Sequence, residues 1–364
     1  MLNNLFSKRI IGIVLLLSFI LLLTACGAEN TTTTNTTNTN TEDTNENTSQ
    51  SEEEVSNSAE TDYPTKPITV LQGFKAGGGS DQLAQMTQPY LSEILGESFV
   101  NEYIPGATGA IAWTQLAKQT ENDGYTLSIT NTPMLMTNYI MNSEINYSIE
   151  ELEPIANVVT DPGVIVVSSD SPFDTYEDFA EYVKEHPGEV TAGNSGTGGD
   201  DFFTQLQWMQ LTGLEIEMVP FEGDGPSWQA AAGNQTDASF TNLGVVYSQI
   251  KSGNLKALAL FTEERYELLP DVPTLKELGI DIISGSSRGY SAPKGIPEDI
   301  KQVLIDAFEE MSQDSEFQQG LKDIALPMDI KLGDEYKQYL EDEEKKFTDI
   351  WNEVKDQYQK ELEK

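Results

Sequence analysis

The sequence has very few of the residues on which enzymes and metal sites usually depend. Among 364 residues there is one cysteine, Cys26, and one histidine, His186. A single cysteine excludes an intrachain disulfide, and its place near the N-terminus excludes a thiol nucleophile in the folded body. A metal site built on His and Cys is excluded as well, and a histidine-based triad would have to use His186, at the predicted end of a helix. We therefore predict no metal, no cofactor and no enzymatic activity.

Basic residues are also scarce. The chain has 21 Lys and Arg against 60 Asp and Glu, a formal net charge of −39. So acidic a surface argues against nucleic acid or anionic lipid as a partner. An anionic ligand would need donors placed locally, or one of the few cations.

The N-terminus has the pattern of a secretory signal. Lys8 and Arg9 precede the apolar run 10–23, which is too short to span a bilayer. The tetrad Leu23-Thr24-Ala25-Cys26 that follows resembles a bacterial lipobox, which implies lipidation of Cys26. We predict a lipoprotein signal peptide over 1–25, with an ordinary secretory signal as the alternative.

The segment 26–62 is dominated by Thr, Asn, Glu and Ser. Such a composition has almost nothing to bury, so it predicts a disordered tether between the anchor and the folded body. A tether of this kind suits a lipoprotein of a Gram-positive cell surface.

Between residues 64 and 332 short apolar runs alternate with helical patterns, which predicts an α/β fold with a mainly parallel sheet. The strands are expected at 68–71, 98–102, 126–130, 155–159, 163–168, 190–193, 216–219, 237–241, 256–261 and 289–292. The helices are expected at 83–94, 110–118, 175–185, 201–211, 226–232, 244–251 and 297–312. Thr175 and Asp178 have the spacing of a capping box at the start of the third of these. The C-terminal stretch has apolar residues at helical intervals from Tyr336 to Val354, and its other positions are mostly Glu, Asp and Lys. It therefore predicts one long amphipathic helix with an acidic solvated face.

Four glycine-rich turns stand between predicted strands and helices, at 72–81, 105–109, 194–200 and 222–226. Glycines let a turn point its N–H groups inward, and the helix that follows presents an N-terminus suited to an anion. Neither a Walker motif nor G-x-G-x-x-G is present in the first turn, so a nucleotide is not the expected ligand. In open α/β sheets such turns gather beyond the strand ends, so we predict a cleft lined by backbone. For the first turn alone, a simple tight turn is the alternative.

Several motifs together resemble the Bug-type substrate-binding proteins of tripartite tricarboxylate transporters. The motifs are Phe74-x-x-Gly77-Gly78-Gly79-Ser80-Asp81, Pro105-Gly106-Ala107-x-Gly109, Ser195-Gly196-x-Gly198 and Leu269-Pro270-Asp271-Val272-Pro273-Thr274. They occur in the order typical of the family, and the resemblance covers residue 63 to the C-terminus.

The resemblance implies a two-lobed periplasmic-binding fold, type II-like, with a central ligand cleft and a hinge of crossing strands. Lobe 1 would comprise 63–165 plus 287–364, and lobe 2 would comprise 166–286. The chain would cross between the lobes at Val164–Ser168 and return at Gly289–Ala292.

The same resemblance implies a site that holds small carboxylates by backbone amides and hydroxyls. The implied ligand-binding residues are Phe74, Gly77, Gly78, Gly79, Ser80, Asp81, Thr130, Asn131, Ser195, Gly196, Thr197, Gly198 and Gly199. Two helix N-termini facing each other would suit a ligand with a carboxylate at each end. Many family members have histidine where this chain has Phe202, so the second carboxylate pocket is expected to differ.

Two cations could supply a positive charge to an anionic ligand. Lys75 lies within the first turn, and Arg288 lies at the expected return crossing. For each, the alternative is a cation that does not contact ligand.

These observations predict an extracytoplasmic solute-binding lipoprotein, anchored to the membrane and monomeric. It would capture a small organic carboxylate, of the di- or tricarboxylate type, and deliver it to the large and small membrane subunits of a tripartite tricarboxylate transporter. One alternative is a ligand-sensing subunit for a membrane signalling partner. Another is a secreted hydrolase, which is less favoured because the sequence has so few residues suited to catalysis.

Overall fold

The computed structural model describes residues 61–362. The predicted signal peptide at 1–25, the lipidation of Cys26 and most of the 26–62 tether lie outside the described residues. Within the described part, no helix combines the length and apolar character needed to cross a bilayer.

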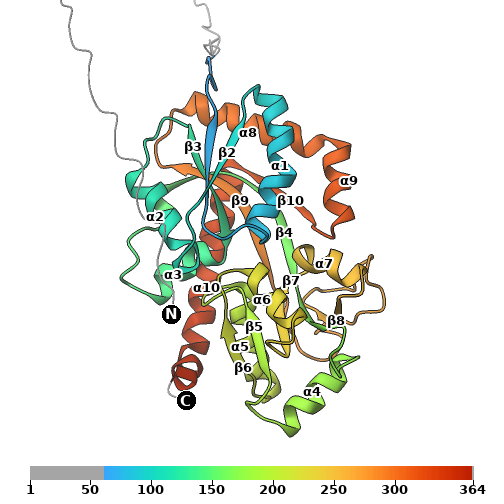
Figure 1. The fold of residues 1–364 in the computed structure, drawn as a ribbon. Helices are drawn as coiled ribbons and strands as arrows, with labels where there is room; N and C mark the ends of the chain where they lie inside the picture. The colour runs from blue at the N-terminus through green and yellow to red at the C-terminus, as the bar shows by residue number, and fades with distance from the viewer. Residues whose placement is uncertain (1–60, 363–364) are drawn as a thin grey trace, which may run out of the picture. The chain divides into compact units, whose positions relative to one another are not determined.

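Two lobes share one sheet (Figure 1). In the first lobe the elements are β1 (Ile68–Gln72), α1 (Gly79–Leu95), β2 (Phe99–Tyr103), α2 (Ala110–Gln119), β3 (Thr126–Thr132), α3 (Met134–Met141), α8 (Glu298–Gln313), α9 (Ser315–Asp323), β10 (Met328–Leu332) and the start of α10 (Gly333–Leu362). In the second lobe they are α4 (Tyr176–Glu185), β5 (Thr191–Asn194), α5 (Asp200–Thr212), β6 (Glu217–Pro220), α6 (Asp224–Ala232), β7 (Ala238–Asn242), α7 (Leu243–Lys251) and β8 (Leu255–Leu260). The crossing strands β4 (Leu152–Ser168) and β9 (Gly285–Pro293) join the lobes.

Among the described residues the sheet has ten strands in the order β2-β1-β3-β9-β4-β7-β5-β6, with β8 and β10 pairing with β4. The two ends are parallel, as β1 pairs with β2 and β3, and β5 pairs with β6 and β7. Every pair that includes β4 or β9 is antiparallel. The prediction of a mainly parallel sheet is therefore wrong for its centre, because there the chain crosses between the lobes and returns.

The strands predicted at 155–159 and 163–168 are one strand, β4. Between them Asp161 and Pro162 pair with β9, and Gly163 pairs with Asn242 of β7. Two flanking strands thus hold the backbone extended through a Pro-Gly pair that, by itself, indicates a turn.

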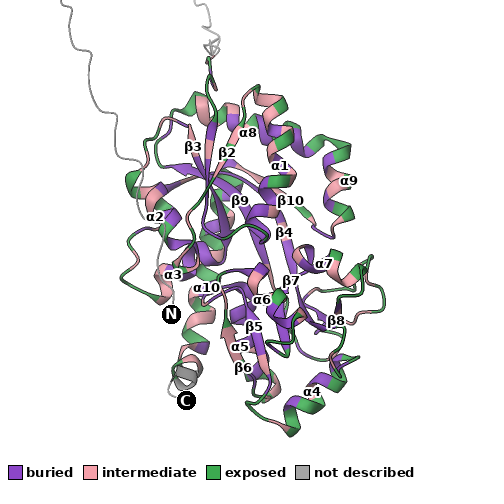
Figure 2. Cartoon of the chain, in the orientation of Figure 1, coloured by how far each residue is buried: buried purple, intermediate pink, exposed green. Residues whose placement is uncertain are grey.

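The last helix, α10, confirms the predicted amphipathic helix and packs into both lobes. Tyr336 and Leu340 belong to the core of the first lobe, while Phe347 and Val354 are buried in the core of the second. The rings of Phe203 on α5 and Phe347 lie 5.4 Å apart. Buried residues follow the sheet and the inner faces of the helices (Figure 2).

Local sequence signals are confirmed at both ends of α4. Thr175 and Asp178 form the predicted capping box of α4, and His186 is the exposed C-cap residue of that helix.

Candidate functional site

The four glycine-rich turns meet where the two lobes face each other. A cavity of about 10 Å³, room for about one water molecule, lies between the first, third and fourth turns. Its lining residues are Phe74, Lys75, Gly78, Gly79, Ser80, Asn131, Met134, Ser195, Asp200, Glu222, Gly223, Asp224, Gly225, Pro226, Asn242 and Ser286. A neighbouring cavity of about 210 Å³ adds the second turn through Pro105, Gly106 and Thr108.

Glycines allow the lobes to come this close. A Cβ on Gly225 of α6 would lie 3.2 Å from the carbonyl oxygen of Gly77 in the opposite lobe. Thr137 of α3 donates a hydrogen bond of 2.6 Å to the carbonyl of Gly198 across the same gap. The lobes are therefore in direct contact, and a ligand larger than water would require them to separate first.

In the first lobe the N-terminus of α1 presents donors to the cavity. Its N-cap residue, Gly78, makes no side-chain cap bond, and Gly78, Gly79 and Ser80 all line the cavity. Asn131 at the end of β3 also lines it and is 6% exposed. Its Oδ1 accepts from Ser80 Oγ at 2.9 Å, and no described residue accepts from its Nδ2. Backbone amides at a helix start beside a buried amide N–H form a site for an anion.

In the second lobe the N-cap residue of α5, Gly199, likewise makes no side-chain cap bond, but some donors of the turn before it are used within the protein. The Asp201 carboxylate accepts from the Ser195 backbone N–H at 2.6 Å, from Ser195 Oγ at 2.7 Å and from the Phe202 N–H at 3.0 Å. Ser195, which the resemblance implies as a ligand-binding residue, is thus bonded to a side chain of the protein itself.

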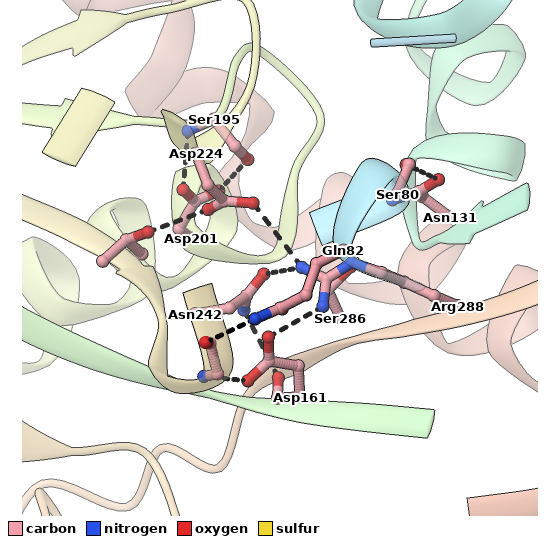
Figure 3. Close-up of polar contacts among 12 residues, drawn as sticks. Ser80, Gln82, Asn131, Asp161, Ser195, Asp201, Asp224, Asn242, Ser286 and Arg288 are labelled. Carbon is pink, nitrogen blue, oxygen red and sulfur yellow. Dashed lines mark hydrogen bonds and ion pairs between the residues drawn. The ribbon is translucent and has the colours of Figure 1, made fainter. Parts of the chain in front are cut away.

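Arg288 connects the lobes at the base of the cleft (Figure 3). From β9 it donates to Asp161 of β4 at 2.8 Å and to Asn242 of β7 at 2.6 Å, and it lies 3.5 Å from the Asp224 carboxylate of α6. Its guanidinium also packs against Gly79 of α1, where a Cβ would lie 2.2 Å from Cζ. Arg288 is 1% exposed and does not line the cavity, so its charge is directed to groups of the protein itself.

Acidic groups outnumber this cation. Asp161, Asp200, Asp201 and Asp224 are all buried around it. Burial raises the pKa of Asp161 to about 6, although Arg288 partly opposes the change. Burial and the neighbouring Asp224 raise the pKa of Asp200 to about 7, and burial raises the pKa of Asp201 well above its usual value.

These shifts predict that the protein becomes less stable as the pH rises. The folded state holds protons on Asp161 and Asp200 more tightly than the unfolded chain does. Their contribution is therefore complete below the unfolded pKa of about 4 and is lost as the pH rises through about 6 and about 7. Urea denaturation at about pH 5 and about pH 8 should give the lower free energy of unfolding at the higher pH.

Surface repulsion among the many acids acts in the same direction, so a control is needed. Asp200→Asn keeps an oxygen for the bond from Asn242 but removes the titration, and should reduce the difference between the two pH values. An unchanged difference in this variant would contradict the assignment to Asp200.

Lys75 lines the cavity at its rim, whereas the predicted site residues outside its lining lie around it. Lys75 is half exposed at the rim and pairs with Glu222 of the opposite lobe. Asp81 accepts from the Gly77 N–H and from Tyr103 OH, while Thr130 is buried against Tyr336 OH. The remaining predicted residues of the third turn, at 196–199, lie in the contact between the lobes, where Gly196 and Thr197 line the neighbouring cavity and Gly198 and Gly199 pack on α3.

Several residues that line the cavity were not predicted from the sequence as ligand-binding residues. They are Met134, Asp200, Glu222, Gly223, Asp224, Gly225, Pro226, Asn242 and Ser286. A signal was present for two of them, since Asp200 and Asp224 each begin a helix directly after a glycine-rich turn. No group of three or more His, Cys, Asp or Glu among the described residues could hold a metal ion.

Two lobes around crossing strands, with helix N-termini at a central cleft, define a solute-binding protein of the periplasmic-binding class. The model of the tripartite tricarboxylate transporter family receptor matches residues 83–355. The chain belongs to this family, which consists of substrate-binding receptors that act outside the cytoplasm.

Individual relatives agree with this assignment. The chain is 32% identical over 250 residues to the protein BugT of Bordetella pertussis, covering 68% of this chain and 76% of BugT. Among solved structures it is similar to Rpa4515 of R. palustris with adipate, at 26% identity and a TM-score of 0.76, covering 80% of this chain and 98% of that one. It is also similar to MatC of Rhodopseudomonas palustris with bound malate, at 25% identity and a TM-score of 0.72, covering 79% and 99%.

Proposed function

We propose that this chain is the solute receptor of a tripartite tricarboxylate transporter. It captures a small organic carboxylate outside the cell, closes its two lobes around the ligand and delivers it to the membrane subunits. We further propose that it acts as a monomer tethered to the membrane by a lipid on Cys26, at a Gram-positive surface.

One observation carries the ligand class. The N-terminus of α1, whose N-cap makes no side-chain bond, lines the cavity together with Asn131, whose Nδ2 has no acceptor among the described residues. A carboxylate there would accept N–H bonds and would be stabilised by the helix dipole. Family membership and the adipate and malate of the two related structures support the same class.

A thermal-shift panel tests the ligand class. Mono-, di- and tricarboxylates are compared with neutral sugars at equal concentration, and at least one carboxylate should raise the melting temperature. A panel in which sugars stabilise the chain and carboxylates do not would overturn the proposal.

A second test introduces a carboxylate at the proposed anion site. Asn131→Asp keeps the acceptor for Ser80 Oγ but replaces the free N–H donor by a negative charge. The affinity for the best carboxylate of the panel should fall about tenfold or more, because a charged hydrogen bond is lost and a like charge is added. Isothermal titration calorimetry measures this affinity, and Asn352→Asp, at an exposed position, is the matched control. Equal affinities in the two variants would show that the ligand binds elsewhere.

A further inference from the structure

A groove lies between the lobes at a place separate from the cleft. It has a volume of about 1030 Å³ and shares no lining residue with the two cavities at the cleft. Its walls are α7 and the segment 266–268 of the second lobe, and α9 and the start of β10 of the first (Figure 1). Sites for small ligands typically have volumes of roughly 300 to 1,000 Å³, so a groove of this size suits a protein segment better.

The groove has an apolar floor and apolar side chains at its rim. Tyr247, Leu321 and Leu326 line it and are buried. Leu268 of the second lobe and Met328 of the first also line it, and they are 40% and 39% exposed. Exposed apolar side chains that gather among polar groups mark an interaction site, whereas a single one is ordinary surface. The two around this groove therefore indicate a protein partner.

The charged side chains of the groove favour a partner that carries carboxylates. Most lysines in the described part of the chain pair with an Asp or Glu. Lys251 and Lys322 line the groove and have no carboxylate partner among the described residues, although Lys251 lies 5.9 Å from the centre of the Tyr247 ring. Of the two acids in the lining, Asp323 already accepts a hydrogen bond from its own helix, which leaves Glu267. On a chain with a net charge of −39, two such lysines form a rare place that attracts carboxylates.

We propose that this groove between α7 and α9 receives a segment of the transporter's membrane subunits that carries a large apolar side chain and carboxylates. The apolar side chain would rest on the floor between Leu268 and Met328, and the carboxylates would pair with Lys251 and Lys322. This inference rests on the proposed function, because it assigns the surface by which the receptor meets those subunits. A second copy of the chain fits the groove less well, since two bodies that each carry a net charge of −39 repel each other.

The position of the groove ties docking to the state of the lobes. Both lobes line it, so it keeps this shape only while the lobes are in contact as described above. The segment would therefore bind the closed receptor more tightly than one whose lobes have separated.

Uptake by the reconstituted transporter tests the assignment. Liposomes that contain the membrane subunits receive the full chain at increasing concentration, with the best carboxylate of the panel at a saturating level. Lys322→Glu reverses a charge and Leu268→Ser removes an apolar contact, both at exposed positions. Each should raise the receptor concentration that gives half-maximal uptake about tenfold or more. Lys184→Glu and Leu211→Ser are the matched controls, because both residues are exposed and neither lines the groove.

Isothermal titration calorimetry separates docking from ligand binding. Lys322→Glu and Leu268→Ser should bind the carboxylate as the wild type does, since neither residue lines the cleft. An unchanged half-maximal concentration in both variants, or a loss of ligand affinity as large as the loss in uptake, would overturn the inference and leave the carboxylate receptor standing. A wild-type dimer in sedimentation that either substitution dissociates would show that the groove receives a second copy, and would also overturn it. If the wild-type chain binds the carboxylate but supports no uptake, the proposed transport function fails, and this inference fails with it.

Discussion

Replacing Arg288 with methionine is expected to lower the free energy of unfolding by about 3 to 5 kcal/mol. Methionine fills similar volume but leaves Asp161 without its cation and Asn242 without its donor, at positions that are 1% exposed or less. Removing one partner of a buried ion pair is costly because the other charge stays buried without compensation. Urea denaturation monitored by tryptophan fluorescence measures the change.

The matched control is Arg265→Met. Arg265 pairs with Glu277 in an exposed position, so its loss should cost about 1 kcal/mol or less. Adding Asp161→Asn to Arg288→Met should recover part of the loss, because the uncompensated charge is then removed. A loss at Arg288 no larger than at Arg265 would show that Arg288 is not the connection between the lobes.

The second large effect concerns closure. Gly225→Val places a side chain where even a Cβ would lie 3.2 Å from the Gly77 carbonyl across the cleft. The lobes then cannot reach the closed contact, and a ligand keeps the contacts of only one lobe. The loss of two charged hydrogen bonds corresponds to about a hundredfold weaker binding of the best panel ligand.

The free energy of unfolding distinguishes blocked closure in Gly225→Val from simple misfolding. Gly225 lies within α6 and needs no left-handed backbone, so Val should leave the free energy of unfolding nearly unchanged. Gly320→Val on α9, remote from the cleft, is the matched control and should keep its affinity. X-ray scattering should also show a larger radius of gyration for Gly225→Val, and unchanged affinity together with an unchanged radius would contradict the closed-cleft account.

Local patterns predicted much of the fold. The amphipathic spacing of α10, the capping box of α4 and the glycine-rich turns between strand and helix are all properties of short segments. The glycine-rich turns follow the carboxyl ends of strands, and in an α/β sheet these ends lie together, so the turns meet at one site. The continuity of β4 through Asp161 and Pro162 could not be predicted, because it depends on pairing with β9, more than 120 residues later.

The electrostatics of the site depend on similar long-range contacts. Arg288 stands 127 residues from Asp161 and 46 from Asn242 along the chain. From sequence it was a candidate for binding an anion, whereas the structure gives it three partners within the protein. The acids at 200 and 224 begin helices, where a carboxylate is ordinary capping chemistry. Only the fold shows that they face a shared cavity.

Native mass spectrometry of the gently purified chain tests the central claim, that the cleft binds a small organic carboxylate. We expect an added mass that corresponds to such an acid, is lost on unfolding and is reduced in the Asn131→Asp variant. An added mass identified as a sugar or nucleotide, or one retained in full by Asn131→Asp, would contradict it.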